Sequence, residues 1–408
     1  MRNRPRPDFL SSSAAGITVP SPRVPRNPGA TKRLLILTSA TGAGHDTHAQ
    51  ATAAWCQKIY GPTVEVLIDH VLENSHYLYR GGVEFYNVIQ RHGPWFHHFY
   101  YNVGEFLELI NYKTVGFGKD YCVQLLEEFR PDAVLSVHGC LNLGYFELVK
   151  QVLGPRVPCA TYCAEFGGGY GFSRNWVNRG GHGFFARTEE AAQVALRRRV
   201  EPRHVHVAGH WAPPPFYGPG LSAAAKEAAF EKMGLNPRLF TLLLSTGGAG
   251  ALNHLSFLKA LLPLRDRLQA IVLCGRNENA QRKIENWADN QASFAVRALP
   301  FTNEMPNLLR MASAVVARAG ATTAGEALLS GCPIIFNALG GMMPQEIPTW
   351  RYFKARNIGD VVSRPSAITA ILRRWLDDPA GYAALRDRLR PFRHDVTPEA
   401  ALHSLLDK

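Results

Sequence analysis

The sequence predicts an α/β protein built from two doubly wound parallel-sheet domains. Two observations carry this prediction. Short apolar segments alternate with longer helical patterns along nearly the whole chain of 408 residues, which is typical of parallel sheets covered by helices. A segment with four prolines and two glycines, WAPPPFYGPG at 211–220, separates two such alternating series and predicts a linker.

The composition is that of a soluble globular protein, with 46% hydrophobic and 19% charged residues. No apolar run reaches the roughly 18 residues that span a bilayer, and the N-terminus lacks the apolar core of a secretory signal. Seven scattered cysteines form no zinc-site spacing, so we expect reduced thiols in the cytoplasm. The net charge of +12 favours an anionic surface or substrate.

Residues 1–31 are expected to form a disordered arm that is basic and rich in proline. Seven basic residues and six prolines fall within 1–33, against Asp8 as the one acidic residue. A solvated tail and an arm that binds polyanions both fit this composition. Of the polyanions, we expect an anionic membrane surface and no nucleic acid.

The first series opens with the apolar strand 32–40, followed at once by Gly42-x-Gly44 and a helix over about 46–59. The next strand, 63–71, contains Asp69 near its end. This unit carries half of a dinucleotide fingerprint, but Thr47 stands where the third glycine belongs, so an oxidoreductase is the weaker reading. The remaining strands of the series are expected at 131–139, 159–165, 183–188 and 204–210.

Residues 75–122 mix many aromatic side chains with histidines, arginines and Lys113. Aromatic rings and long cations suit a membrane interface, where amphipathic side chains are stable. A pair of core helices with large aromatics gives the same pattern. Both interpretations stay open at this point.

The second series repeats the order of strand, glycine loop and helix. Strands are expected at 240–251, 270–279, 294–301, 314–320 and 333–341, and two further helices fill the C-terminus. The glycine loops of both series follow strands, at the edge where open α/β sheets bind their ligands.

One stretch of the second series, residues 317–336, indicates a nucleotide site. Gly320 breaks a β-branched strand, and Thr322 and Thr323 are expected to cap the helix that follows. The start of a helix attracts anions because its N–H groups are unpaired and its dipole is positive there. Glu326 lies one turn further, within reach of a sugar hydroxyl. Phosphate beside ribose predicts a nucleotide.

At this point the chain resembles a known group of enzymes. The runs LCGRN at 273–277, LPFTNEMPNLLRMASAVVARAG at 299–320, GCPIIF at 331–336 and PQE at 344–346 are similar to the monogalactosyldiacylglycerol synthases. The processive diacylglycerol glucosyltransferases and the lipid II N-acetylglucosaminyltransferase are related to them. TSATGAGHDTHAQA at 38–51 resembles their Gly-Gly-Gly-His loop, and the resemblance covers about 33–363.

The resemblance implies a GT-B architecture, with two Rossmann-like domains facing a central cleft. The acceptor domain would span 32–212, the UDP-sugar domain 213–363, and C-terminal helices 364–408. The implied activity is inverting transfer of galactose or glucose from a UDP-sugar to diacylglycerol. The implied place is the inner face of a membrane, where the protein is peripheral. No cofactor and no metal are expected.

The resemblance also implies roles for individual residues. The nucleotide would lie against the start of the opening helix and the glycine loops, and the donor sugar against the PQE run. These donor residues are Gly247, Gly248, Gly275, Arg276, Asn277, Gly320, Ala321, Thr322 and Glu326 for the nucleotide, and Gln345 and Glu346 for the sugar. The acceptor-side candidates are Gly42, Gly44, His45, Asp46, His138 and Glu165.

The chain departs from the group at the position of a candidate catalytic base. Plant-type relatives have an Asp immediately before the glycine-histidine run, and this chain has Ala40. His45 is therefore the first choice as catalytic base, ahead of Asp46, His138 and Glu165. The departure leaves two alternatives: N-acetylglucosaminyl transfer to another lipid acceptor, and a non-catalytic relative that binds nucleotide or anionic lipid.

Overall fold

A computed structural model describes residues 29–92, 96–99, 101–102, 115–245, 253–291, 293–394 and 396–407. The arm expected at 1–31 lies almost entirely outside these residues. No helix within the described ranges is long and apolar enough to cross a membrane.

The first sheet has six parallel strands in the order β2-β1-β3-β4-β5-β6. Its strands are β1 (Lys32–Thr38), β2 (Val64–His70), β3 (Ala133–Ser136), β4 (Cys159–Cys163), β5 (Gly183–Ala186) and β6 (Val205–Val207). Its helices are α1 (Gly44–Tyr60), α2 (Val71–Ser75), α3 (Tyr77–His92), α5 (Lys119–Phe129), α6 (Tyr145–Leu153) and α7 (Glu189–Arg197). All six strands fall inside the segments expected from the sequence.

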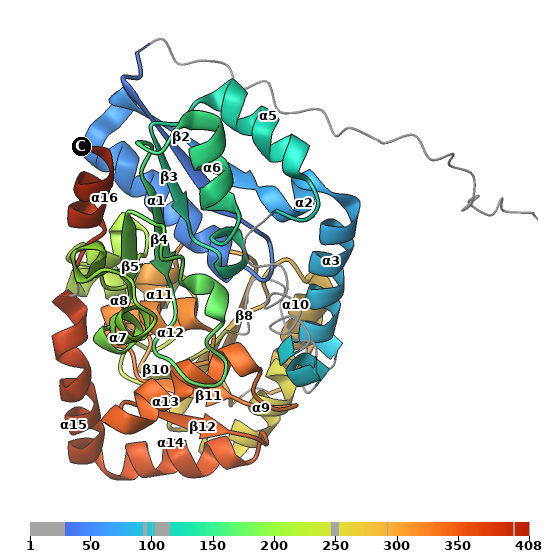
Figure 1. The fold of residues 1–408 in the computed structure, drawn as a ribbon. Helices are drawn as coiled ribbons and strands as arrows, with labels where there is room; N and C mark the ends of the chain where they lie inside the picture. Colours follow the sequence, from blue (N-terminus) through green and yellow to red (C-terminus); the bar gives the residue numbers. More distant parts are fainter. Residues whose placement is uncertain are drawn as a thin grey trace, which may run out of the picture.

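The second sheet is also parallel, in the order β12-β11-β10-β7-β8-β9. Its strands are β7 (Phe240–Ser245), β8 (Leu268–Leu273), β9 (Val296–Leu299), β10 (Ala314–Ala317), β11 (Ile334–Asn337) and β12 (Gly359–Val362). Its helices are α8 (Ala223–Lys232), α9 (His254–Leu261), α10 (Glu278–Asp289), α11 (Met305–Met311), α12 (Ala321–Ser330), α13 (Ile347–Arg356), α14 (Ala367–Asp377) and α15 (Pro379–Leu389). The two sheets lie in the upper and lower lobes of Figure 1.

The strand β12 was missed in the sequence, where only helices were expected after 341. Its four residues, GDVV, start with a glycine and an aspartate, and three of them are partly exposed. Edge strands bury little surface, so the apolar signal that identifies the central strands is weak there.

The strands are buried on both faces, as the continuous apolar run of β1 predicts. Leu34 and Ile36 belong to a core cluster with Trp55 of α1, whereas Leu35 and Leu37 belong to a second cluster on the opposite face. Successive side chains of a strand point to opposite faces, so helices must cover both sides of the sheet.

The last helix, α16 (Glu399–Leu406), returns from the second lobe to the first. Leu402 is fully buried in the cluster that contains Trp55. The Tyr60 hydroxyl lies 3.0 Å from Nδ1 of His403 and 3.1 Å from Asp407. The end of the chain therefore packs on the domain where the chain began, a placement that the helical pattern alone did not reveal.

The cap expected at the nucleotide stretch is wrong in one detail. The helix α12 begins at Ala321 with Gly320 as its N-cap, and no side chain caps it. Thr322 and Thr323 lie within the first turn. The Thr322 hydroxyl instead contacts Nε2 of His48 in the first domain, at 3.2 Å.

Candidate functional site

The loop after β1 is held by two helices of its own domain. The Glu73 carboxylate of α2 accepts hydrogen bonds from the Ser39 hydroxyl at 3.0 Å and from the Ala40 N–H at 2.6 Å. Asn87 of α3 accepts from the Gly42 N–H and donates to the Ala40 carbonyl, each at 3.1 Å. Gly42 has a positive φ of 74°, which glycine adopts without strain. The loop is thus fixed at the entrance to α1.

His45 in the first turn of α1 has the geometry of a general base. Its Nδ1 lies 2.8 Å from the Val137 carbonyl, and a carbonyl only accepts, so Nδ1 carries the proton. The lone pair is therefore on Nε2. Burial lowers the pKa of His45 from its usual 6.5, so the ring is neutral at neutral pH.

The other three base candidates are engaged or enclosed. His138 accepts from the Cys140 N–H through Nδ1 and contacts the Thr41 hydroxyl through Nε2, at 3.2 and 2.7 Å. Its ring lies 4.3 Å from that of His45, so it supports that side chain. Asp46 pairs with His70 at 2.9 Å. Glu165 is buried, which raises its pKa to about 7.

Glu326 is buried against the domain boundary. It is 7% exposed, and burial raises its pKa to about 8. Gly325 beside it leaves room for the ring of His210, because a Cβ there would lie 2.4 Å from Nδ1 of that ring. The carboxyl group lies one turn into α12, and its contact with a ribose stays a prediction.

Three further donor candidates, Gly275, Arg276 and Asn277, follow the carboxyl end of β8 in the second sheet. Gly275 has a positive φ of 57°, the Arg276 guanidinium carbon lies 4.9 Å from the ring centre of Phe301, and Asn277 caps α10. Gly247 and Gly248 lie outside the described residues.

Of the two residues expected to bind the donor sugar, Glu346 uses both carboxylate oxygens in contacts within the protein. Its carboxylate pairs with Arg318 through both oxygens, at 2.9 and 2.5 Å, and accepts from the Met343 N–H. Gln345 instead reaches the other domain, donating to the Tyr86 hydroxyl of α3 at 2.9 Å. The structure thus places Glu346 as the partner of Arg318, and its contact with a sugar stays a prediction.

The two predicted halves meet where the starts of α1 and α12 face each other, at the middle of Figure 1. A Cβ on Gly44 would lie 2.8 Å from the Thr322 hydroxyl, and Nε2 of His48 lies 3.2 Å from the same oxygen. The loop that holds His45 and the start of α12 are therefore in contact across the two domains.

Sequence reasoning missed three residues of this junction: His48, Arg187 and His210. His48 is three residues beyond His45 on α1, and this spacing places the two side chains on the same face of the helix, which could have identified His48 from the sequence. Arg187 follows β5 directly and is only 4% exposed. A charged residue at the carboxyl end of a parallel strand is the corresponding signal.

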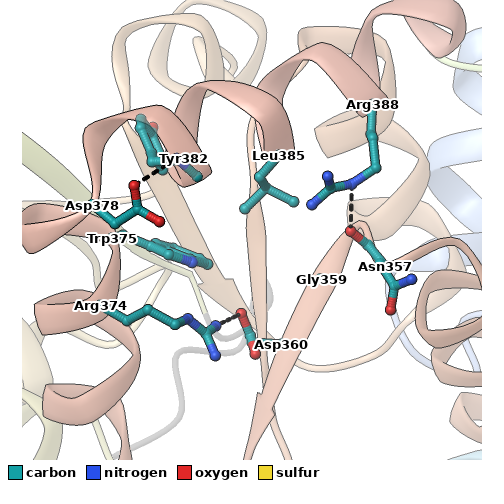
Figure 2. Close-up of a pocket in the computed structure, with 10 residues that line it drawn as sticks. Asn357, Gly359, Asp360, Arg374, Trp375, Asp378, Tyr382, Leu385 and Arg388 are labelled. Atoms are coloured by element: carbon teal, nitrogen blue, oxygen red, sulfur yellow. Dashed lines mark hydrogen bonds and ion pairs between the residues drawn. The ribbon is translucent and has the colours of Figure 1, made fainter.

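A cavity of about 270 Å³ lies elsewhere, between α14, α15 and the start of β12 (Figure 2). Its polar side chains are paired with one another or with the backbone. Arg374 contacts Asp360 at 2.6 Å, Arg388 donates to the Asn357 carbonyl at 3.0 Å, and Asp378 caps α15. None of the predicted site residues lines this cavity.

Two protein-family models match the chain, one on each domain. The family described as monogalactosyldiacylglycerol (MGDG) synthase matches residues 45–210, and the glycosyltransferase family 28 C-terminal domain matches residues 241–340.

Curated relatives extend over most of the chain. A probable chloroplastic monogalactosyldiacylglycerol synthase 2 of Oryza sativa subsp. japonica is 26% identical over 388 residues, covering 90% of this chain and 78% of that protein. A processive diacylglycerol beta-glucosyltransferase of Staphylococcus epidermidis is 22% identical over 346 residues, covering 82% of each chain.

Solved structures share the fold. MurG of Acinetobacter baumannii superposes with a TM-score of 0.56 at 14% identity, covering 91% of this chain and 98% of that one. A UDP-GlcNAc 2-epimerase of Neisseria meningitidis bound to UDP-GlcNAc gives 0.54 at 14% identity, with 92% and 99% covered. The GT-B fold thus serves more than one chemistry, and the residues of the junction must decide between them.

Proposed function

We propose that this chain transfers a hexose from a UDP-sugar to diacylglycerol, because glycosyltransferase family models match both of its domains and its curated relatives include monogalactosyldiacylglycerol synthases and processive diacylglycerol glucosyltransferases. The sugar is galactose or glucose, and the product is a monoglycosyl diacylglycerol. The transfer inverts the configuration at the anomeric carbon.

One observation carries the proposal: a neutral histidine with its lone pair on Nε2 lies next to the residue that packs against the start of a helix from the other domain. His45 and Gly44 are neighbours in α1, and Gly44 packs against Thr322 in the first turn of α12. The first domain thus contributes a base for the acceptor hydroxyl. The second contributes an anion site for the leaving group, at the same junction.

The reaction uses these two groups in a single displacement. The acceptor hydroxyl gives its proton to Nε2 of His45, and its oxygen forms a bond to C1 of the sugar. The bond from C1 to the β-phosphate oxygen breaks, and the electron pair stays on UDP. The N–H groups at residues 321–323 stabilise the diphosphate, and Glu326 binds the ribose hydroxyls.

No metal ion takes part in this proposal, because the helix start and its neighbours supply the positive potential. We expect turnover to persist when divalent cations are removed by a chelator. A loss of activity that Mg²⁺ or Mn²⁺ restores would contradict this part.

We further propose that α3 docks the protein on the anionic inner face of a membrane. One side of this helix exposes Tyr77, Leu78, Phe85 and Val88, of which Tyr77 is 73% and Phe85 51% exposed. Rings and aliphatic side chains on one helix face insert into the headgroup region, and the net charge of +12 favours anionic lipid. Docking there brings diacylglycerol to the domain that holds His45.

The experiment is a matrix of labelled UDP-galactose, UDP-glucose and UDP-GlcNAc against vesicles with and without diacylglycerol, analysed by product mass. We expect a hexosyl diacylglycerol and stoichiometric UDP. Transfer of N-acetylglucosamine, or transfer only to lipids other than diacylglycerol, would reject the proposed pair of substrates. Release of UDP without any glycolipid product would reject diacylglycerol as the acceptor but would leave the UDP-sugar as the donor.

A further inference from the structure

Arg187 is a buried cation at the junction of the two domains. It follows β5 directly, and its guanidinium carbon lies 4.5 Å from the ring centre of Phe166. One terminal nitrogen donates to the carbonyl of Ala321, the first residue of α12. The other lies 3.4 Å from Nε2 of His48. The acceptor domain thus places a positive charge at the start of the nucleotide helix.

This charge has no anionic partner among the described residues. Its hydrogen bonds go to a carbonyl and a histidine ring, and its buried Nε has no partner at all. Glu165 and Glu326 are the acids that interact with it electrostatically, but burial raises their pKa values to about 7 and about 8. Burial thus favours the neutral form of both carboxyls, and a buried charge without a partner is costly.

The surroundings add further positive potential. The starts of α1 and α12, with 17 and 10 residues, face each other here, and each helix start is the positive end of its dipole. Arg187 lies beside one of these helix starts. It is only 4% exposed, and its Nε–H has no hydrogen-bond partner within the described part of the chain. A small anion with more than one negative charge is the ligand that this arrangement fits.

We propose that Arg187 binds the diphosphate of the UDP-sugar from the acceptor domain and stabilises UDP as the leaving group. This inference rests on the proposed function. On donor binding, the guanidinium exchanges the Ala321 carbonyl for phosphate oxygens, which form stronger, charge-assisted hydrogen bonds. As the bond from C1 breaks, the electron pair remains on the β-phosphate oxygen and the acceptor proton goes to His45, so charge and protons balance.

The test compares the affinities of UDP and uridine, because the two ligands differ by the diphosphate. Arg187→Gln keeps an N–H donor for the Ala321 carbonyl, and Arg187→Met keeps the packing on Phe166, so each removes the charge while preserving a different structural contact. We expect UDP to bind about tenfold to a hundredfold more weakly to either variant, as for a lost hydrogen bond to a charged group, with uridine unchanged. Arg187→Lys should recover part of the loss.

Arg33→Gln is the matched control. Arg33 also lies over a phenylalanine ring and donates to a backbone carbonyl, both of Phe129, but at the opposite end of β1 from the loop. Its removal should leave the ratio of UDP to uridine affinity unchanged. Thermal unfolding of each variant verifies that it is folded. If only one of Arg187→Gln and Arg187→Met is folded, the affinities are measured with that variant.

Turnover adds a second readout. Because charge develops on the diphosphate in the transition state, kcat should fall in the uncharged Arg187 variants while the KM for diacylglycerol stays the same. Equal losses for UDP and uridine, or no loss for UDP, would overturn the role of Arg187 and leave the proposed function intact. A wild-type chain that binds neither ligand would overturn the proposed function itself.

Discussion

His45 combines a fixed tautomer with a lowered pKa, and both properties suit a base. We expect His45→Asn to reduce kcat by about a hundredfold to ten-thousandfold, because asparagine keeps a donor for the Val137 carbonyl but has no basic nitrogen. The pH profile of the wild type tests the same assignment. Burial lowers the pKa of His45, so the neutral form persists below 6.5 and the acidic limb of kcat should lie below that value.

The partly exposed His204, in the turn before β6, supplies the control, since His204→Asn should leave kcat unchanged. An acidic limb at or above 6.5, or a His45→Asn variant with normal turnover, would assign the base to another group.

Glu326 has a pKa raised to about 8 by burial, so its carboxyl is mostly protonated before the nucleotide binds. Two ribose hydroxyls that donate to it favour the ionised form, so UDP binding should release a proton. The affinity of UDP should therefore rise from pH 6.5 to pH 8.5. We expect Glu326→Gln to bind UDP about tenfold more weakly and to lose this pH dependence. Calorimetry in two buffers of different ionisation enthalpy measures the proton directly.

The variant Glu304→Gln changes an exposed carboxyl on the same domain and should keep the wild-type profile. Parallel pH profiles for Glu326→Gln and the wild type would exclude Glu326 as the ribose ligand.

At the scale of one element, α3 has two different faces. Its outer face carries the exposed Phe85 and Val88, whereas Asn87 binds the loop before His45 and Tyr86 binds Gln345. We expect Phe85→Ser with Val88→Ser to weaken binding to anionic vesicles by about tenfold or more, since insertion of each side chain contributes on the order of 1 kcal/mol. Vesicle sedimentation measures the binding.

UDP affinity should stay unchanged in that double variant, because neither side chain faces the junction. Glu84→Gln, exposed on the same helix, is the matched control for vesicle binding. Undiminished sedimentation of the double variant would locate the docking surface on another element.

At the scale of the whole molecule, α16 ties the end of the chain to the first domain. Leu402 is fully buried beside Trp55, so Leu402→Ala should lower the free energy of unfolding by about 2–4 kcal/mol. Ser404→Ala on the same helix removes only a local hydrogen bond to the Ala401 carbonyl and should cost less than about 1 kcal/mol. Urea unfolding of both variants gives the comparison, and equal midpoints would show that α16 adds no stability.

The elements that could be predicted from the sequence are those whose burial leaves a clear pattern of apolar residues. Central strands such as β1 are apolar on both faces and are identified directly, whereas the edge strand β12 buries little and was missed. The return of α16 to the first domain was likewise invisible, because an amphipathic pattern gives the buried face of a helix and not the surface that covers it.

The candidate site divides in the same way. Gly42, His45 and Glu326 follow strands or open helices, and that local context made them recognisable. Glu346 also stood in a recognisable run, but its pairing with Arg318 depends on a contact between distant parts of the chain. His48 stands in the run at 38–51, but nothing in that run sets it apart from its neighbours, and Arg187 belongs to none of the quoted runs, so their spatial neighbours identify them.

The sequence alone predicts the two parallel-sheet domains and the resemblance to diacylglycerol glycosyltransferases, because strand burial, glycine turns and helix starts are local properties of the chain. The nucleotide half of the site stays a prediction. The tertiary structure decided which residues meet between the domains. It brought the start of α1, next to His45, against the start of α12, fixed the proton of His45 on Nδ1, and buried Arg187 without an ion pair among the described residues. The physical reason is that proton transfer and charge compensation depend on distances and burial between segments far apart in sequence, which no local pattern encodes.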